Sequence, residues 1–262
     1  MADGLLLAID IGNTNIVLGV FDGVELKVSW RLATLRDRTS DELGVWVAQL
    51  FQHSRIDVSK VRGVVISSVV PPLTRIATTM VDRYFKLKPL VVDGDTKTGM
   101  PVLYENPAEV GADRIVNGVG AYERYGRSSG RPVIVVDFGT ATTFDAISAK
   151  GEYLGGVICP GIQISADALF QRAARLPRID VQRPKQVIGR TTVSSMESGL
   201  FYGYVSLVEG LVQRIRGELG SSAVCVATGG LADVIAPETR TIEEVDPELT
   251  LRGLRIVWER NQ

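Results

Sequence analysis

The sequence predicts an α/β protein made of two lobes with duplicated topology, and three observations support this prediction. An apolar run at residues 5–9 ends in an Asp-x-Gly turn at Asp10, and further strand-like segments follow it. A second apolar run at residues 133–136 ends in the same kind of turn at Asp137, again followed by strand-like segments. Helical patterns with capping signals lie between the two copies. Alternation of strands and helices of this kind is typical of α/β folds.

The first copy is expected to contain strands at 5–9, 16–21 and 25–32, a helix at 40–54, a strand at 61–67, a helix at 73–85, a short strand at 89–92 and a helix opened by Asn106 and Pro107 that runs toward residue 125. The second copy is expected to contain strands at 133–136, 142–147 and 153–158, one long or two abutting helices at 193–219, and a strand at 223–227. The copies have diverged too far for a short-period repeat, so the duplication concerns whole domains. We place the boundary near residue 117, which gives lobes 1–116 and 117–262.

Composition excludes several classes of partner. The formal net charge of the 262-residue chain is −1, so no broad positive field exists to attract nucleic acid or an acidic membrane. Residues 1–4 carry no basic segment, and Asp10, Asn13 and Asn15 interrupt the apolar stretch that follows. We therefore expect neither a signal peptide nor a transmembrane helix, and a cytoplasmic protein.

The scarcity of histidine and cysteine restricts the chemistry. His53 is the sole histidine, and the two cysteines, Cys159 and Cys225, lie inside apolar runs where a buried reduced thiol is the simplest interpretation. A zinc site, a Ser-His-Asp triad and a Cys-His pair are all disfavoured. The remaining options use carboxylates, hydroxyls, backbone amides and a hard metal ion.

Two glycine turns are the candidate phosphate-binding elements. The chain has no Walker or Rossmann glycine motif, but it has the turns DIGNTN at residues 10–15 and DFGTATT at 137–143. Glycine lets the main chain approach phosphate oxygens, and Asp10 at a strand end can hold hydrated Mg²⁺. Each turn alone is equally well explained as an ordinary Asp-x-Gly turn. Two copies at the starts of two lobes indicate a nucleotide site, to which residues 228–230, Thr-Gly-Gly, would add an approach to adenosine.

Asp113 is the candidate general base. It lies early in a predicted helix, where the helix dipole and the adjacent Arg114 are expected to keep its carboxylate ionised, with a low pKa. Phosphoryl transfer needs a base only late in the reaction, and Arg114 can bind an anionic group of the substrate. The alternative is a surface Asp-Arg pair that supports the start of the helix.

Two other features are assigned no role in the site. The basic stretch at residues 172–190 is most simply a solvated linker. Leu200, Phe201, Tyr202 and Tyr204 are most simply used for core or interface packing.

Taken together, these motifs resemble the type III pantothenate kinases, within the superfamily of acetate and sugar kinases, heat-shock chaperone ATPases and actin. The resemblance covers nearly the whole chain and is carried by the segments AIDIGNTN (8–15), ISSVVPP (66–72), GADR (111–114), VDFGTATTF (136–144), PG (160–161) and TGG (228–230). It implies two ribonuclease H-like lobes with a nucleotide cleft between them, the actin-like ATPase fold. It also implies transfer of the ATP γ-phosphate to the primary hydroxyl of pantothenate, which gives 4′-phosphopantothenate for coenzyme A synthesis.

The resemblance also assigns residues. It implies that ATP is bound by Thr140 and by the first turn, that is by Asp10, Ile11, Gly12, Asn13, Thr14, Asn15, Ile16 and Val17. It implies that pantothenate is bound by Tyr104, Gly111, Ala112, Asp113, Arg114 and Thr192, with Asp113 as proton acceptor. A monovalent cation, K⁺ or NH₄⁺, is expected at Asp137, and a homodimer is expected with the substrate pocket near its interface. The family often has asparagine where this chain has Thr191, which is a mild departure beside Thr192.

Two other functions remain open at this point. A sugar or other small-alcohol kinase of the same superfamily would keep the chemistry and change the acceptor, although the cysteine-rich zinc motif of one large sugar-kinase group is missing. In a non-catalytic, nucleotide-gated binding protein, Asp113 would have no role, and a further substrate-binding domain would be required.

Overall fold

The structure is a computed structural model, which describes residues 4–262. The expectations for residues 1–3 therefore lie outside the described residues. The chain divides into two compact units: the first contains the residues up to 100 together with 105–120 and 250–262, and the second contains 101–104 and 121–249. This division differs from the continuous lobes 1–116 and 117–262, because the C-terminal helix groups with the N-terminal half of the chain.

The first unit is built on a five-stranded sheet in the order β3-β2-β1-β4-β5. β1, β2 and β3 are antiparallel neighbours, whereas β4 and β5 run parallel to β1. The strands are β1 (Leu5–Ile11), β2 (Asn15–Asp22), β3 (Glu25–Ala33), β4 (Val61–Ser68) and β5 (Leu90–Val91). The helices of this unit are α1 (Ser40–His53), α2 (Pro71–Phe85), α3 (Ala112–Ala121) and α7 (Leu249–Glu259).

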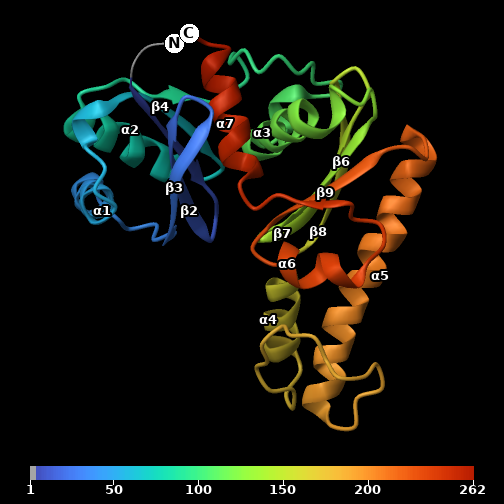
Figure 1. The fold of residues 1–262 in the computed structure, drawn as a ribbon. Helices are drawn as coiled ribbons and strands as arrows, with labels where there is room; N and C mark the ends of the chain where they lie inside the picture. Colours follow the sequence, from blue (N-terminus) through green and yellow to red (C-terminus); the bar gives the residue numbers. More distant parts are fainter. Residues whose placement is uncertain (1–3) are drawn as a thin grey trace. The chain divides into compact units, whose positions relative to one another are not determined.

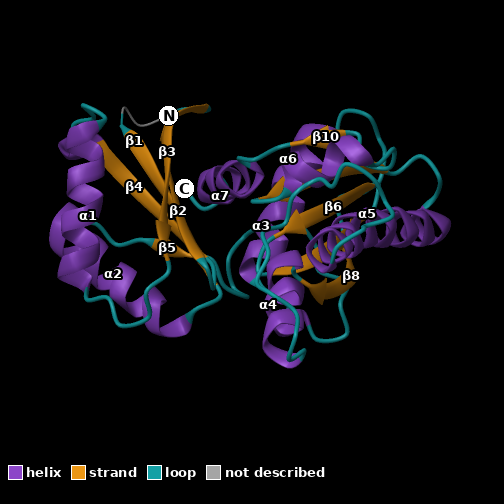
Figure 2. Ribbon diagram, turned by 90° about the horizontal axis from the view of Figure 1, so that it is seen from below, coloured by secondary structure: helices purple, strands orange, loops and turns teal. Residues whose placement is uncertain are grey.

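Helices cover both faces of this sheet (Figure 2). One face packs against α1 and α2 through a buried cluster that includes Ile9, Leu18 and Phe51. The other face receives α7, because Gly63 and Gly19 leave room for side chains of that helix. A methyl group at Gly19 would lie 2.8 Å from a Leu251 methyl carbon. The alternation of large and small residues along the strands thus determines which helix lies on which face.

The second unit repeats the same sheet, in the order β8-β7-β6-β9-β10. Its strands are β6 (Val133–Phe138), β7 (Ala141–Ile147), β8 (Tyr153–Pro160), β9 (Val224–Gly229) and β10 (Glu244–Val245). Three antiparallel strands are again followed by two parallel ones. The helices α4 (Ile162–Arg172), α5 (Thr192–Leu219) and α6 (Ala232–Ile235) pack on one face through a single buried cluster (Figure 1). The predicted α/β fold with duplicated topology is therefore confirmed.

Several elements differ from the sequence expectation. Asn106 and Pro107 do not open a long helix: they begin a 3₁₀ turn, Pro107–Glu109, and α3 starts only at Ala112. A π-helical turn, Tyr122–Gly126, follows α3. The long pattern near residue 200 is a single 28-residue helix, α5. The sequence patterns did not reveal α4, α6, α7, β10 or the 3₁₀ turns Val58–Lys60 and Ala236–Glu238. Within residues 4–262, no helix combines the length and the apolar character that a membrane crossing requires.

A close approach between α3 and α7 yields the first testable prediction. A methyl group at Gly253 in α7 would overlap the Val116 main-chain carbonyl oxygen in α3. We expect Gly253→Ala to lower the free energy of unfolding by about 1–3 kcal/mol, because backbone must move to accommodate the added carbon. Denaturant unfolding of Gly253→Ala and of the wild-type protein measures this difference in the free energy of unfolding.

The matched control is Gly217→Ala in α5, where an added methyl group meets nothing within 4 Å. This control should stabilise the protein by about 0.5–1 kcal/mol, since alanine favours helix. Equal effects of the two substitutions would contradict the proposed contact.

Candidate active site

The first glycine turn is held in place by two hydrogen bonds at Gly12, one from main chain to main chain and one from a side-chain hydroxyl. The Gly12 amide donates to the Asn15 carbonyl at 2.9 Å, and the Thr34 hydroxyl, after β3, donates to the Gly12 carbonyl at 2.8 Å. Asn13 and Thr14 are exposed, whereas the Ile11 and Ile16 side chains lie in the core. Of the residues expected to bind ATP, Ile11 and Ile16 can therefore contact a ligand only through their main chain.

Asp10 lies in β1 directly beside Ser67 of β4. The two residues are partners in the parallel register, so their side chains lie on the same face of the sheet. Ser67 is fully buried, and its hydroxyl oxygen has no hydrogen-bond partner among the described residues. A carboxylate next to an unsatisfied hydroxyl is a set of hard oxygen donors that suits a hydrated Mg²⁺ ion. The residues present thus fit the metal that a nucleotide would bring.

A short chain of contacts joins the first turn to Asp113. The Val69 amide, in the loop after β4, donates to the Ile11 carbonyl at 3.1 Å. The Val69 side chain lies against Gly111, where an added methyl group would be 3.6 Å from Val69 Cγ1 and 2.5 Å from Asp113 Oδ1. Gly111 therefore leaves the space that the Asp113 carboxylate occupies. The predicted base and the first turn lie in one unit, connected through Val69.

The environment of Asp113 corrects one expectation. Burial raises the pKa of its carboxyl above the ordinary value of 3.8, and the Arg114 amide and the charge of Arg114 offset this only in part. The Arg114 amide donates to Asp113 Oδ1 at 2.8 Å. The expectation of a low pKa was wrong because sequence shows the adjacent cation and the helix start but not the desolvation. A raised pKa makes the ionised carboxylate a stronger proton acceptor.

Arg114 is also not a surface residue. It is only 8% exposed, so the interpretation of Asp113 and Arg114 as a solvated surface pair does not fit. Burying a guanidinium is costly unless charged or polar groups accompany it. Its place in the first turn of α3, next to Asp113, is suited to binding an anionic group.

The second glycine turn brings together residues from three strand ends. The parallel pairing of β6 with β9 sets Asp137 beside Thr228. Gly229 adopts a φ of +92°, and a methyl group there would lie 2.5 Å from Asp137 Oδ1. The Gly161 amide donates to the Thr140 carbonyl at 3.1 Å. Asp137, the exposed Thr140, the Pro-Gly segment and the Thr-Gly-Gly segment thus form one cluster.

Tyr104 is held beside the first residue of β8. The Tyr153 amide donates to the Pro101 carbonyl and the Leu103 amide donates to the Tyr153 carbonyl, both at 2.8 Å. The ring centroids of Tyr104 and Tyr153 are 6.4 Å apart. Tyr104 is 36% exposed, so part of its ring remains available to a ligand.

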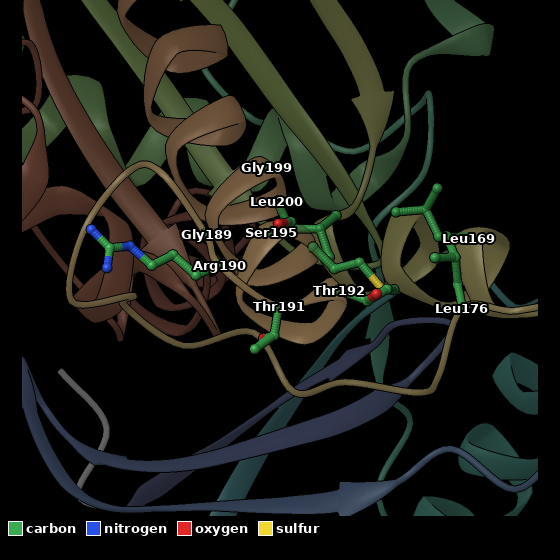
Figure 3. A pocket seen from close by; sticks show the side chains of 10 residues that line it. Leu169, Leu176, Gly189, Arg190, Thr191, Thr192, Ser195, Gly199 and Leu200 are labelled. Carbon is green, nitrogen blue, oxygen red and sulfur yellow. The ribbon is translucent and has the colours of Figure 1, made fainter.

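Thr192 lines an open pocket of about 860 Å³ at the N-terminus of α5 (Figure 3). Thr191 caps this helix by accepting a hydrogen bond from the Ser194 amide at 3.1 Å. Figure 3 shows Leu169 and Leu176 on the side of the pocket opposite Arg190. The lining residues are Leu169, Leu176, Gly189, Arg190, Thr191, Thr192, Ser195, Met196, Gly199 and Leu200.

Two residues to which the sequence patterns assign no site role line this pocket. Leu200 belongs to the core, which confirms the packing prediction, and it also lines the pocket. Arg190, which the sequence patterns place in a solvated linker, lines it as well. The apolar side comes from α4, the following loop and α5. No spacing along the chain marks such residues, because the pocket forms only when these segments pack.

The chain is similar to known proteins over most of its length. The family model described as type III pantothenate kinase matches residues 6–214. A type III pantothenate kinase of Moorella thermoacetica is 57% identical over 257 residues, covering 98% of this chain and 100% of that protein. One from Myxococcus xanthus is 58% identical, covering 98% and 99%.

A solved structure extends the comparison to the fold. The inorganic polyphosphate/ATP-glucomannokinase of Arthrobacter sp. strain KM superposes with a TM-score of 0.51 at 16% identity, covering 98% of both chains. Such a likeness concerns the fold alone, and it agrees with the α/β fold of duplicated topology. With the family model spanning most of the chain and full-length relatives above half identity, this chain belongs to the type III pantothenate kinase family.

Proposed function

We propose that this protein transfers the γ-phosphate of ATP to the primary hydroxyl of pantothenate, giving 4′-phosphopantothenate, the first step of coenzyme A synthesis. Family membership supports the substrates. The observation that carries the mechanism is the contact chain from Ile11 through Val69 and Gly111 to Asp113, which keeps a carboxylate of raised pKa beside a glycine turn.

The first turn is proposed to bind the triphosphate. The exposed side chains of Asn13 and Thr14 are donors suited to phosphate oxygens, and Gly12 allows the main chain to come close. Asp10 is proposed to hold the waters of Mg²⁺, with Ser67 as its buried neighbour. When bound, the metal neutralises charge on the phosphates during transfer.

Asp113 is proposed as the general base. As the pantothenate hydroxyl oxygen bonds to the γ-phosphorus and ADP leaves, the hydroxyl proton passes to the Asp113 carboxylate. Arg114 is proposed to bind the pantothenate carboxylate as its counter-ion. Tyr104 and Thr192 are proposed to contact the rest of pantothenate, supported by their partial exposure and by the pocket beside Thr192.

Asp137 and Thr140 are proposed to act at a monovalent cation and at ATP, respectively. Their support is the cluster at the second turn, where Gly229 and Gly161 bring main chain close to both residues. Carboxylate and carbonyl oxygens can coordinate K⁺ and can accept the hydrogen bonds that NH₄⁺ donates.

Two properties of the whole protein are also proposed. Exposed apolar residues near the pocket, including Val187, Val193 and Ile188 at 79% exposure, support a homodimer that covers them. Light scattering that returned the mass of one chain would contradict it. A cytoplasmic location is supported by membership of the type III pantothenate kinase family, and recovery in a secreted or membrane fraction would contradict it.

An ADP-release assay tests the acceptor and the cation together. The purified protein is offered pantothenate, a panel of sugars and a panel of short hydroxy acids, once in potassium and once in sodium. Among these acceptors we expect turnover only with pantothenate, and we expect it to be faster in potassium than in sodium. Turnover with a sugar instead would favour the small-alcohol kinase alternative, and ATP binding without turnover on any acceptor would favour the nucleotide-gated binding protein.

Asp113→Asn tests the base. Removing the proton acceptor while keeping the side-chain shape should lower kcat by about 10²- to 10⁴-fold with ATP binding retained. Steady-state kinetics and nucleotide titration measure the two effects. Asp82→Asn, an exposed carboxylate of α2, is the control and should leave kcat unchanged. Wild-type turnover by Asp113→Asn would remove this residue from the mechanism.

The same substitution should stabilise the protein at neutral pH. Because the folded-state pKa of Asp113 lies above its ordinary value of 3.8, the folded protein retains this proton more strongly than the unfolded chain. Above the folded-state pKa, ionised Asp113 therefore lowers the free energy of unfolding. This destabilisation disappears as the pH falls toward the pKa of Asp113 in the unfolded state. We expect Asp113→Asn to raise the urea midpoint at pH 7 and to raise it less at pH values near 4, a pattern that Asp82→Asn should not show. A lower midpoint at pH 7 would contradict the desolvation of Asp113.

A further inference from the structure

We propose that Asp145 and Tyr153 form a positioning pair that fixes the ring of Tyr104 for the acceptor substrate. The proposal rests on the proposed function, because it assumes that Tyr104 contacts pantothenate. All three residues belong to the second unit. Neither the sequence motifs nor the mechanism above assigns a role to Asp145 or Tyr153.

The pair is a fully buried carboxyl and phenol joined by a short hydrogen bond. Asp145 in β7 and Tyr153 in β8 are both 0% exposed. Tyr153 Oη donates to Asp145 Oδ1 at 2.7 Å, and Thr143 Oγ1 donates to Asp145 Oδ2 at 3.4 Å. A buried carboxyl is costly unless its oxygens are hydrogen-bonded, and apolar residues could fill the same space without that cost. A use beyond packing would account for the polar pair.

A β-bulge brings the two side chains to the same face of the sheet. Ala146 pairs with Gly155 but Ile147 pairs with Tyr153, so Leu154 is an extra residue in β8. Side chains alternate between faces along a strand, and Asp145 pairs with Gly156, so without the extra residue Tyr153 would point to the opposite face from Asp145. Gly155 accommodates the bulge with a φ of +128°.

Tyr153 in turn holds Tyr104 in two ways. Its amide and carbonyl both bond to the segment 101–104, through Pro101 and Leu103. Its ring packs against the Tyr104 ring at an interplanar angle of 56°. The Tyr104 ring also lies over the bulge, since a methyl group at Gly155 would be 3.5 Å from Tyr104 Cε2. Fixing the Tyr153 ring by its bond to Asp145 therefore fixes the surface on which Tyr104 lies.

The test is a set of kinetic measurements on Tyr153→Phe and Asp145→Asn. Tyr153→Phe keeps the ring and removes only its hydroxyl, and Asp145→Asn keeps the side-chain size. We expect the KM for pantothenate to rise by about 5- to 30-fold in each, with kcat and the KM for ATP within about 2-fold of wild type. A merely structural role would lower the unfolding midpoint without this selective change in KM.

A double-mutant cycle with Tyr104 locates the effect. Tyr104→Ala should raise the KM for pantothenate, and adding Tyr153→Phe to it should change that KM by less than about 2-fold, because the two residues act through one contact. The matched control is Tyr122→Phe, whose hydroxyl donates to the Ala149 carbonyl at 3.3 Å in the same unit and which should keep a wild-type KM. An unchanged pantothenate KM in folded Tyr153→Phe, an equal rise in the KM for ATP, or full additivity with Tyr104→Ala would overturn the proposal.

A second measurement separates this proposal from the proposed function. If the wild-type protein does not phosphorylate pantothenate, the proposed function fails, and nitration of Tyr104 by tetranitromethane, followed by mass spectrometry, still tests the pair. We expect faster nitration of Tyr104 in Tyr153→Phe and Asp145→Asn than in wild type and Tyr122→Phe. Equal rates in all four proteins would overturn the positioning role.

Discussion

The parallel pairing of β1 with β4 is the constraint on which the first half of the candidate site depends. It places the carboxyl ends of both strands at one edge of the sheet, where Asp10 lies beside Ser67 and the Val69 amide bonds to the Ile11 carbonyl. Gly111 can then lie against Val69 and leave space for the Asp113 carboxylate. A candidate base more than 100 residues along the chain from Asp10 is thereby connected to the phosphate turn through main chain and one valine.

The second unit uses the same sheet for a different local arrangement. Two residues, Gly139 and Thr140, connect β6 to β7, whereas residues 12–14 connect β1 to β2. Both turns contain exposed residues, Asn13 and Thr14 in the first and Thr140 in the second, and Gly161 at the start of α4 lies against the carbonyl oxygens of the second turn. Duplication of topology has thus produced two exposed turns that differ in length and in the segments packed against them.

Buried polar groups recur at the positions that matter for the proposed chemistry. Asp113 has a raised pKa because it is desolvated, and Arg114 and Asp145 are buried although neither residue type favours burial. Burying a charged group costs free energy of desolvation that burying an apolar side chain does not. Such local conflicts between packing and polarity are expected at functional sites, where activity and stability compete.

The sequence by itself determined the two α/β copies, both glycine turns and the family. Local hydrophobic periodicity predicts the copies, and contiguous motifs such as residues 10–15 and 111–114 predict the turns and the family. Only the tertiary structure decided the raised pKa of Asp113, the burial of Arg114, the bulge that turns Tyr153 toward Asp145, and the return of α7 to the first unit. Desolvation and helix packing arise from segments far apart in the chain, so no local pattern encodes them. The bulge lies within one hairpin, but hydrophobic alternation does not mark Leu154 as the extra residue.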